Sequence, residues 1–449
     1  MSFPGYADYR DAEAEWLPRL PTHWRLASLR WLSRRFSGGT PDKNSPEYWE
    51  NGTIPWLNSG EVNQGLITAP STFISDAGFA NSSAKWIPAG ALVMALAGQG
   101  KTKGMVAQLA FPATCNQSMA AIVPSAEVNA RFLYWWLQSN YQNIRNMAGG
   151  DLRDGLNLDL LGEIPCPLPS SAEQSGIAAF LDRETAKIDA LVEEQKRLIE
   201  LLKEKRQAVI SQAVTKGLDP SVPMKDSGVA WLGEVPAHWV VMPIRVAARL
   251  ESGHTPSRSR PDWWENCTVP WFTLADVWQI RQGADVIYET EEKVSELGLA
   301  NSSARRLPKG TVMLSRTASV GFSAIMGTDM ATTQDFANWV CGDKVLPEFL
   351  LCVFRSMSGE FRRLMMGSTH NTIYMPDIQA LRFALPPIPE QRNIVEHVRK
   401  AVASFDGLTN EAQRGVDLLT ERRSALISAA VTGKIDVRGL APRPEVIAA

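Results

Sequence analysis

The sequence contains two copies of one long unit, and this repeat constrains the fold more than any other feature. A Trp-Leu pair followed by a His-Trp pair occurs at 16–24 and returns 215 residues later. Residues 37–56 match residues 252–271 at 11 of 20 positions. The repeating units of solenoids are only about 20 to 50 residues long. The chain is therefore predicted to be two similar folded units in tandem.

A long helical stretch follows the first unit. Residues 172–215 contain no proline, and apolar side chains recur there at helical spacing, interrupted by polar residues such as Gln195. A capping box of Ser171 and Gln174 is expected to start this helix, and Gly217 to end it. At 1.5 Å per residue the helix would span roughly 66 Å. We interpret it as a spacer whose apolar stripe needs a partner.

The predicted partner is a second stretch, residues 390–432, reached by adding 217 to each position. It contains Gly407 and Gly415, so we expect it to be the weaker helix and to depend on the first. A two-fold that relates two similar units makes their helices antiparallel, which predicts an intramolecular coiled coil. The expected seam residues are Ile177, Leu181, Ile188, Leu191, Leu198, Leu202, Val209, Ile394, Phe405 and Leu419.

The rest of each unit carries mixed helix and strand signals. Short apolar runs after Pro-x-Gly turns, at 91–94 and 311–314, are typical of buried strands. Residues 132–137 and 349–354 are predicted to be short apolar helices. The predicted fold class is α+β, with two pseudo-repeated globular domains joined by two long antiparallel coiled-coil helices. The expected segments are the domains 1–168 and 218–386, the helices 169–217 and 387–434, and a tail, 435–449.

Composition narrows the possible environments. The net charge of −2 gives no general attraction to nucleic acid, so a DNA-binding face would have to be local. One candidate is the basic run from Arg25 to Arg35, although a solvated helix face explains it equally well. The 5 cysteines lack metal-ligand spacing and are expected to be buried thiols in a reducing cytoplasm. We see neither a signal peptide nor an apolar run of membrane-spanning length.

Common catalytic motifs are missing or misplaced. Residues 95–102 resemble a phosphate-binding loop but begin with Ala95 in place of glycine. The only Pro-Pro pair, at 386–387, lies in a linker, where it cannot serve an amino-methyltransferase motif. His23 and His238 each precede a tryptophan and are expected to pack against it. The sequence therefore predicts neither a catalytic constellation nor a metal site.

Between the two copies the framework repeats, whereas three pairs of loops differ. They are residues 98–104 against 316–321, residues 149–159 against 367–377, and residues 58–61 against 273–276. Arg, Lys, Asn and Gln side chains read base edges, and Ser, Thr and Tyr reach phosphates. The alternative is that surface loops simply vary. The candidate DNA-binding residues are Gln99, Lys101, Lys103, Arg153, Asn157, Arg316, Thr317, His370, Asn371 and Tyr374.

Taken together, the motifs resemble the specificity subunit of a type I restriction–modification system over nearly the whole chain. They are the Trp-Leu-x-x-x-Pro-x-His-Trp start of each copy, the Gly-x-Thr-Pro segment after it, the Glu-Gln helix start (173–174 and 390–391) and the Ala-Val-Thr helix end (213–215 and 430–432). The chain departs from this pattern in its glycine-interrupted second helix and in lacking, in the first copy, the Gly-Glu found at 233–234.

This resemblance implies that each globular unit recognises one half of a bipartite, asymmetric site in double-stranded DNA. It implies that the helices hold two methyltransferase subunits, which methylate adenine, and that restriction/translocase subunits join through them. No cofactor is then expected in this chain, since S-adenosylmethionine belongs to the methyltransferase partner and ATP and Mg to the restriction partner. Two alternatives remain: a stand-alone DNA-modifying enzyme with an unrecognised site, and a coiled-coil scaffold for proteins alone.

Overall fold

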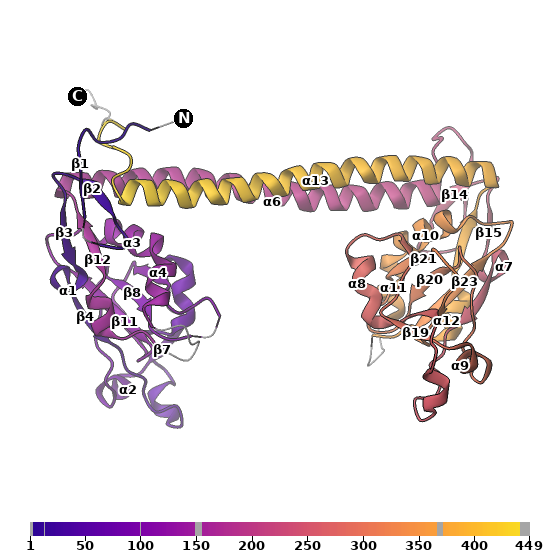
Figure 1. Ribbon diagram of the computed structural model, residues 1–449, viewed down its shortest axis with the longest axis horizontal. Coiled ribbons are helices and arrows are strands. Elements are labelled where there is room, and N and C mark those ends of the chain that lie inside the picture. The colour runs from indigo at the N-terminus through magenta and orange to yellow at the C-terminus, as the bar shows by residue number, and fades with distance from the viewer. Residues whose placement is uncertain (1–2, 13, 99, 149–154, 366–370, 441–449) are drawn as a thin grey trace. The chain divides into compact units, whose positions relative to one another are not determined.

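The structure is a computed structural model that describes residues 3–12, 14–98, 100–148, 155–365 and 371–440. The chain divides into two compact units. Unit 1 comprises residues 1–195 and 415–449, and unit 2 comprises residues 196–414. Helices α6 (Ser171–Lys216) and α13 (Ile388–Val431) each contribute one part to each unit (Figure 1). The units therefore divide inside the long helices, whereas the segments expected from the sequence divide at the helix ends.

The globular part of unit 1 is built on a five-stranded sheet in the order β4-β11-β8-β9-β6. Its strands are β4 (Ser33–Ser37), β6 (Leu66–Ile67), β8 (Leu92–Ala95), β9 (Val106–Leu109) and β11 (Met119–Pro124). All neighbours pair antiparallel except β6 and β9. A smaller sheet contains β5 (Ile54–Leu57), β7 (Thr72–Ile74) and β10 (Thr114–Cys115). The pairs β1 (Tyr9–Asp11) with β2 (Arg19–Pro21) and β3 (Arg25–Ser28) with β12 (Pro165–Leu168) complete the strands.

Short helices connect these strands. They are α1 (Leu29–Leu32), α2 (Asp76–Ala80), α3 (Ala130–Ser139), α4 (Tyr141–Asn146), α5 (Leu158–Gly162) and the 3-10 turns η1 (Pro46–Tyr48) and η2 (Ser59–Gln64). Helix α3 includes the apolar run 132–137, so the helix predicted there is confirmed.

Unit 2 repeats this topology element by element. Its five-stranded sheet has the order β16-β23-β20-β21-β18, with β16 (Ala248–Ser252), β18 (Val286–Ile287), β20 (Val312–Ser315), β21 (Ser323–Met326) and β23 (Phe336–Cys341). The smaller sheet contains β17 (Val269–Phe272), β19 (Glu292–Val294) and β22 (Ala331–Thr332). The paired strands are β13 (Met224–Asp226) with β14 (Glu234–Pro236) and β15 (Val240–Pro243) with β24 (Arg382–Leu385).

The helices of unit 2 follow the same order, with one addition. They are α7 (Ile244–Ala247), α8 (Val277–Arg281), α9 (Glu296–Ala300), α10 (Pro347–Ser356), α11 (Ser358–Met365), α12 (Met375–Ala380), η3 (Pro261–Trp264) and η4 (Leu274–Asp276). The added helix is α8, which lies where unit 1 has only the end of η2. The α+β class and the pseudo-repeat predicted from the sequence are thus confirmed.

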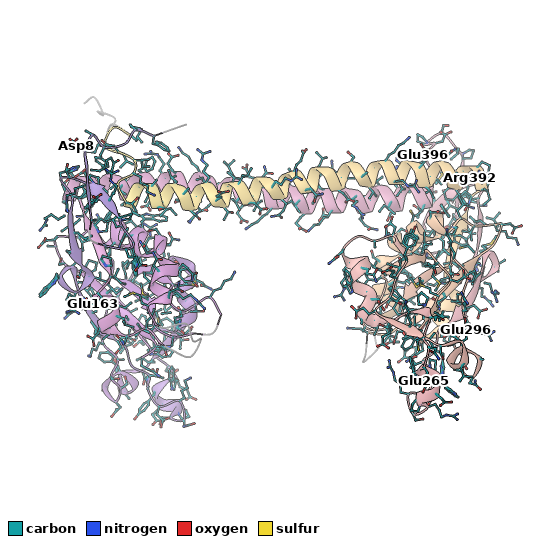
Figure 2. All side chains as sticks on the ribbon, in the orientation of Figure 1. Asp8, Glu163, Glu265, Glu296, Arg392 and Glu396 are labelled. Carbon is teal, nitrogen blue, oxygen red and sulfur yellow. The ribbon has the colours of Figure 1, made fainter. Side chains whose placement is uncertain are left out.

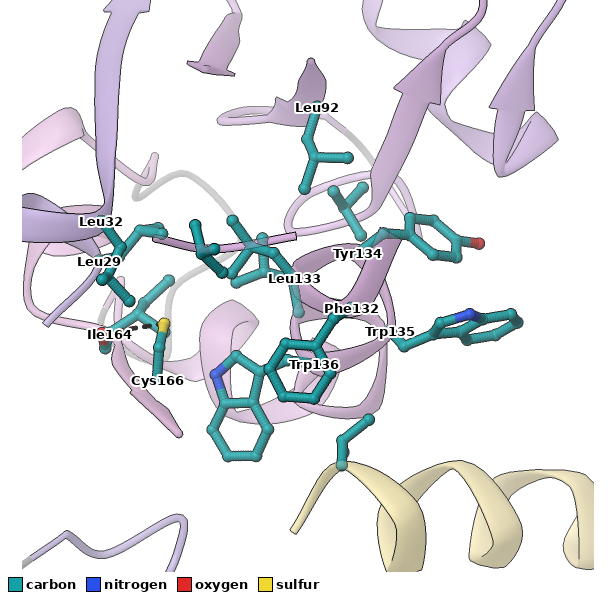
Figure 3. Packing of buried hydrophobic residues seen from close by; sticks show 14 of the residues in the cluster. Leu29, Leu32, Leu92, Phe132, Leu133, Tyr134, Trp135, Trp136, Ile164 and Cys166 are labelled. Carbon is teal, nitrogen blue, oxygen red and sulfur yellow. Dashed lines mark hydrogen bonds between the residues drawn. The ribbon is translucent and has the colours of Figure 1, made fainter. Parts of the chain in front are cut away.

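The central strands β8 and β20 are buried at every position because both faces of the sheet are covered. In β8, Leu92 and Met94 belong to one hydrophobic cluster and Val93 and Ala95 to another. Figure 3 shows the first cluster, which contains Leu92 of β8, Leu133 of α3 and Cys166 of β12. In β20 the same alternation assigns Val312 and Leu314 to one cluster and Met313 to the other. Both strands predicted from apolar runs are confirmed.

The start of α6 is tied to the His-Trp motif of unit 1. The Nε2 atom of His23 lies 2.8 Å from Oε1 of Glu173, and Trp24 Nε1 donates to the same oxygen at 3.4 Å. Gly433, which follows α13 with φ of +70°, packs against the Trp24 ring, and a Cβ there would lie 3.1 Å from it. The expectation that His23 simply packs on its neighbour is therefore corrected: its partner is a carboxylate at a helix start.

Unit 2 has the same arrangement with the helices exchanged. His238 Nε2 lies 2.8 Å from Oε2 of Glu390 at the start of α13, and Trp239 Nε1 donates to Oε1 at 3.0 Å. Gly217, at the end of α6 with φ of +73°, packs on Trp239. Each tryptophan thus contacts the first turn of one long helix and the glycine that lies within two residues of the end of the other. We call this set of contacts the clasp.

A buried glutamine completes each clasp. Gln391 accepts from Leu346 N at 2.9 Å and donates to Lys344 O and Pro386 O, each at 2.9 Å. Gln174 makes the matching three bonds in unit 1. The capping box of α6 therefore lies one residue earlier than expected, because Ser170 pairs reciprocally with Glu173. Gln174 is engaged with the globular domain and does not cap the helix.

Inside each unit the long helices pack antiparallel. In unit 1, Ile177 and Leu181 share a hydrophobic cluster with Ile427 and Ala430 near the end of α13. In unit 2, Ile210 and Ala213 near the end of α6 share one with Ile394. Exposed ion pairs join Arg423 to Asp189 at 2.7 Å and Arg206 to Asp406 at 3.0 Å. Helix α13 runs unbroken through Gly407 and Gly415, so the interruption expected from these glycines is not seen.

The seam of α6 differs in register from the predicted one. Ile177, Leu181, Ile188, Leu202 and Ile394 are buried, and Val209, Phe405 and Leu419 are half-buried. Leu191 and Leu198, however, are 46% and 43% exposed. From Leu181 the seam continues through Thr185, Ile188, Val192, Gln195, Ile199 and Leu202, which are the positions from 185 to 202 that are not exposed, a spacing of four then three. The prediction assumed three then four, which wrongly put the two exposed leucines on the seam.

Candidate nucleic-acid interface

In unit 2, three segments that are distant in sequence meet at the end of β20. Arg316 N donates to Asp335 O at 2.9 Å in the turn before β23. Ile373 N donates to Arg316 O at 2.8 Å, and Thr317 forms a backbone bridge with Thr372. Two of these three segments are loops that differ between the copies. The fold therefore joins them into one surface.

The Arg316 side chain holds these segments together. Its Nε donates to the carbonyl oxygen of Gln334 at 3.0 Å, and its Nη1 donates to that of Ile373 at 3.4 Å. The guanidinium is half-buried between the segments it binds. Arg316, expected to contact DNA, is thus first a positioning residue for the loops around it.

Unit 1 joins the matching segments through backbone atoms. Leu96 N donates to Ser118 O at 2.8 Å, and Leu156 N donates to Leu96 O at 2.8 Å. Leu96 stands where unit 2 has Arg316, and its side chain is buried. The two units therefore join their loops with the same pair of backbone bonds, to which only unit 2 adds bonds from the side chain at this position.

The candidate residues of unit 1 have different surroundings. Lys101 is exposed, and its carbonyl oxygen accepts from Tyr141 Oη at 2.6 Å. Asn157 is exposed and caps α5 by accepting from Leu160 N at 2.8 Å. Lys103 is only 4% exposed, so its expected place on the surface is corrected. Gln99 and Arg153 lie outside the described residues.

In unit 2 the exposed candidates cluster before α12. Tyr374 is 58% exposed and directly precedes this helix. Asn371 is exposed, with a left-handed φ of +46° that orients the loop. Thr317 is half-buried, and His370 lies outside the described residues. Tyr374 and Asn371 therefore come next to Arg316 and Thr317 in one surface.

The third pair of differing loops, after Trp56 and Trp271, belongs to the framework. Asn58 forms a capping box with Glu61, and Thr273 forms one with Asp276. Both carboxylates are buried. These residues differ in identity yet build the same capping box, so part of each loop supports the framework, and a reading role for this pair stays a prediction.

Sequence reasoning missed a repeated polar pair beside the joined loops. Thr255 Oγ1 donates to Gln334 Oε1 at 2.8 Å, and Thr40 makes the same bond to Gln117. Both glutamines are exposed. Their recurrence could have revealed them, but it marked them as framework and not as surface.

The basic run from Arg25 to Arg35 is largely engaged in pairs. Arg25 forms an ion pair with Glu127 at 2.9 Å, and Arg30 forms one with Glu163, which is labelled in Figure 2. Arg35 Nη1 donates to the carbonyl oxygens of Leu29 and Ser33. The run covers β3, α1 and β4 and is not a single helix face. It adds little free positive charge to the interface.

The described residues contain no group of three or more His, Cys, Asp or Glu side chains placed to hold a metal ion. Cys115, Cys166 and Cys352 are buried, while Cys267 and Cys341 are only half-buried, contrary to expectation. Burial raises the pKa of Cys115 to about 12 and that of Cys352 to about 11. Among the described helices, none has the length and apolar content needed to cross a membrane.

Comparison with known proteins supplies the context for this surface. The sequence model described as "Type I restriction modification DNA specificity domain" matches residues 31–201 and 236–414. The chain is 22% identical over 437 residues to the Type I restriction enzyme MjaIX specificity subunit of Methanocaldococcus jannaschii, covering 94% of this chain and 96% of that protein. It is 21% identical to the EcoKI specificity subunit of Escherichia coli K12, covering 96% and 93%.

Other similarities are more local or concern the fold alone. The EcoR124I/EcoR124II specificity subunit of Escherichia coli is 28% identical over 197 residues, which cover 43% of this chain and 46% of that protein. A solved structure described by the assembly and conformational transition of the type I R-M system matches with a TM-score of 0.70 at 17% identity, over 92% of this chain and 98% of that one. The HsdS subunit from Thermoanaerobacter tengcongensis matches over the same shares at 0.55 and 17%.

Proposed function

The chain belongs to the family of type I restriction–modification DNA specificity proteins, and we propose that each of its units reads one half of a bipartite, asymmetric DNA site. The observation that carries this proposal is the pair of loop surfaces at the ends of β8 and β20. The frameworks match strand for strand, whereas the residues on these surfaces differ. Two readers with one fold and different side chains suit a target whose halves differ in sequence.

The exposed side chains on these surfaces have suitable chemistry. Asn157 in unit 1 and Asn371 in unit 2 can form the paired hydrogen bonds that distinguish adenine in the major groove. Lys101 supplies a cation for a phosphate or a guanine, and Tyr374 supplies a hydroxyl on an exposed ring. Together they give each unit its own pattern of donors and acceptors.

The long helices are proposed to bind the methyltransferase subunits. Large apolar side chains are exposed on α6 and α13 although both helices have a buried seam. They are Leu191, Leu198, Leu201, Leu408 and Leu418. Exposed leucines at such a density are typical of protein–protein contact sites. They occur on both helices, which suits two copies of one partner.

Catalysis is assigned to the partners. The described residues show no metal-binding group, and the buried thiols of this chain have raised pKa values, unlike reactive cysteines. Methyl transfer from S-adenosylmethionine then belongs to the methyltransferase subunits, and ATP-dependent restriction to the restriction subunits. The assembly is proposed to act in the cytoplasm, on the cell's DNA.

The test is to express the chain with and without its methyltransferase partners and to sequence the methylated bases. The assembled complex should methylate one bipartite, asymmetric site, whereas the chain alone should transfer no methyl groups. Methylation by the purified chain alone would overturn the division of labour. A single continuous or symmetric site would overturn the proposal of two different readers.

Docking has its own matched pair of variants. Leu191→Glu adds a charge at the exposed apolar position, and Ala190→Glu adds the same charge at an exposed position one residue away. Because both positions are exposed, both variants should fold normally. Only Leu191→Glu should lose methyltransferase subunits on co-purification. Equal retention of the partner by the two variants would contradict docking at this leucine.

A further inference from the structure

An exposed Thr–Gln pair occurs at the same place in both units. Thr255 Oγ1 donates to Gln334 Oε1 at 2.8 Å, and Thr40 Oγ1 donates to Gln117 Oε1. Each threonine follows the first strand of its large sheet, and each glutamine lies in the turn before the strand paired with it. The two amides thus occupy equivalent surface positions.

The fold does not depend on this pair, because the backbone already joins the same segments. Gly39 N donates to Cys115 O at 2.9 Å, and His254 N donates to Thr332 O at 3.0 Å. The backbones approach so closely that a Cβ on Gly38 would lie 1.8 Å from Cys115 O. A hydrogen bond between exposed side chains adds little net stability, since water competes for both groups. The recurrence of the pair therefore has another cause.

The pair borders the loops that differ between the units. The carbonyl oxygen of Gln334 accepts from Arg316 Nε at 3.0 Å. In unit 1, Ser118, directly after Gln117, accepts from Leu96 N at 2.8 Å. Each unit thus has an identical amide next to side chains that are not identical.

The threonine orients this amide. With Oε1 occupied by the threonine hydroxyl, the glutamine offers its NH2 group outward as a hydrogen-bond donor. Under the proposed function the base edges differ between the two half-sites, but each half-site has backbone phosphates. An identical donor in two differing readers therefore fits the acceptor that the half-sites share.

We propose that the side-chain amides of Gln117 and Gln334 each donate to a DNA backbone phosphate and fix the register of their unit on its half-site. This inference rests on the proposed function and adds a sequence-independent contact to it. Loss of this contact should leave the base preference unchanged, because a phosphate carries no sequence information. Gln117 and Gln334 are thus positioning residues on the DNA.

A cation at matching positions supports the assignment. Lys85 Nζ lies 5.9 Å from the centroid of Phe36 in β4, and Arg305 Nε lies 3.6 Å from Glu251 at the equivalent position of β16. Both cationic side chains are exposed. In unit 1 the chain before Lys85 packs directly on Gly39, next to the threonine of the pair. Each unit therefore has an amide donor and a cationic side chain at the same edge, although in unit 2 this cation is paired with Glu251.

The test uses the full chain assembled with its methyltransferase partners and DNA carrying the site that the wild-type complex methylates. Gln117→Ala and Gln334→Ala should each weaken binding about tenfold, the usual effect of losing a hydrogen bond to a charged group. The methylated sequence should stay the same. Glutamine is uncharged, so the dependence of affinity on salt should keep its slope, whereas Lys85→Ala should reduce that slope by about one.

Two controls separate a phosphate contact from a structural role. Thr40→Val removes the bond within the protein and keeps the amide, so it should lower affinity less than Gln117→Ala does. DNA in which one phosphate of the half-site is replaced by an uncharged methylphosphonate should bind wild type and Gln117→Ala equally well.

Contrary results can be divided into those that overturn this inference alone and one that also overturns the proposed function. Unchanged affinity in both glutamine variants, equal losses in Thr40→Val and Gln117→Ala, or relaxed preference at one base would each overturn the phosphate contact. Under all three the proposed function would stand, provided that the wild-type complex binds its bipartite site. If the wild-type complex showed no such site, the proposed function would fail, and this inference with it.

Discussion

In both units the backbone of the residue after the central strand, Leu96 or Arg316, holds the loop that follows, but in unit 2 the Arg316 side chain adds two further hydrogen bonds. The strands beneath the two loops pair in the same order, and the clasps beside them use the same four residue types. The difference is therefore confined to the surface that is free to change. Repeated residues hold the helices and the sheets and supply the Gln117 and Gln334 amides, whereas non-repeated residues form the loops proposed to read bases.

Equivalent substitutions in the two clasps should lower stability by the same amount, and this is the largest effect that we expect. Gln174→Ala and Gln391→Ala each leave one N–H and two carbonyl groups without a partner inside the protein. Each should lower the free energy of unfolding by about 2–4 kcal/mol, given about 1–3 kcal/mol for the one fully buried carbonyl left unpaired and less for the two part-buried groups, which water can reach. Chemical denaturation measures this loss, with Gln212→Ala, at an exposed position of α6, as the control. A loss in only one of the two variants would contradict the equivalence of the clasps.

The loop surfaces should respond differently. Arg316→Ala removes the two side-chain bonds to Gln334 O and Ile373 O, so the loops of unit 2, left with their backbone bonds alone, should be held less firmly. Affinity for the native site should fall about tenfold or more, because unit 2 would recognise its half-site less well. Arg316→Lys keeps the charge without the paired donors and should rescue little.

The change compared with it in unit 1 is Lys101→Ala, at an exposed position in the loop after β8. It should lower affinity for all sequences by a smaller factor and reduce the salt slope by about one, as expected of a phosphate contact. The two variants are compared on DNA in which one half-site is scrambled. Arg316→Ala should lose affinity only where the half-site read by unit 2 is intact, whereas Lys101→Ala should lose affinity on every DNA. If Arg316→Ala behaved like Lys101→Ala, the positioning role of Arg316 would be wrong.

A smaller effect concerns acid stability. Burial alone would raise the pKa of Glu173, but hydrogen bonds from His23, Ser170 and Trp24 outweigh it and hold the pKa below its ordinary value. A lowered carboxyl pKa adds stability above the unfolded value, about 4.3, and this stability is lost as the pH falls through the folded value. Glu173→Gln should therefore lower Tm at pH 7 by more than it does near pH 4. A gap in Tm that stayed constant over this range would contradict the assignment.

The sequence predicted the long helices to within two residues because local chemistry marks their ends. Prolines precede both helices, and Gly217 and Gly433 follow them with the left-handed φ that glycine adopts easily. The buried strands were equally clear, since short apolar runs that follow turns usually form buried strands.

The seam register was not predictable in the same way. Leu191 and Leu198 are more apolar than their neighbours, while the true seam includes Thr185 and Gln195. Hydrophobicity alone therefore favours the wrong face. The polar seam is tolerated because each unit packs its own end of the helices against a globular core.

Contacts between distant residues were also missed. His23 and Glu173 of the unit 1 clasp are 150 residues apart, and nothing in either local sequence indicates that they pair. The loop of Arg316 meets residues 334 and 373 only after the sheet has formed. Sequence differences found the loops that vary, but only the fold shows which of them form one surface.

The most direct test of the two-reader account uses the chain's own repeat. Residues 24–165 are replaced with the matching residues 239–382, so that both ends of the chain carry the reader of unit 2. The full complex is then expressed, and its methylated sequence is read from the cell's DNA. The account predicts a symmetric site built from the unit 2 half-site twice, with the original spacer. A site that remained asymmetric, or one in which both halves were new, would contradict the claim that each unit reads its own half.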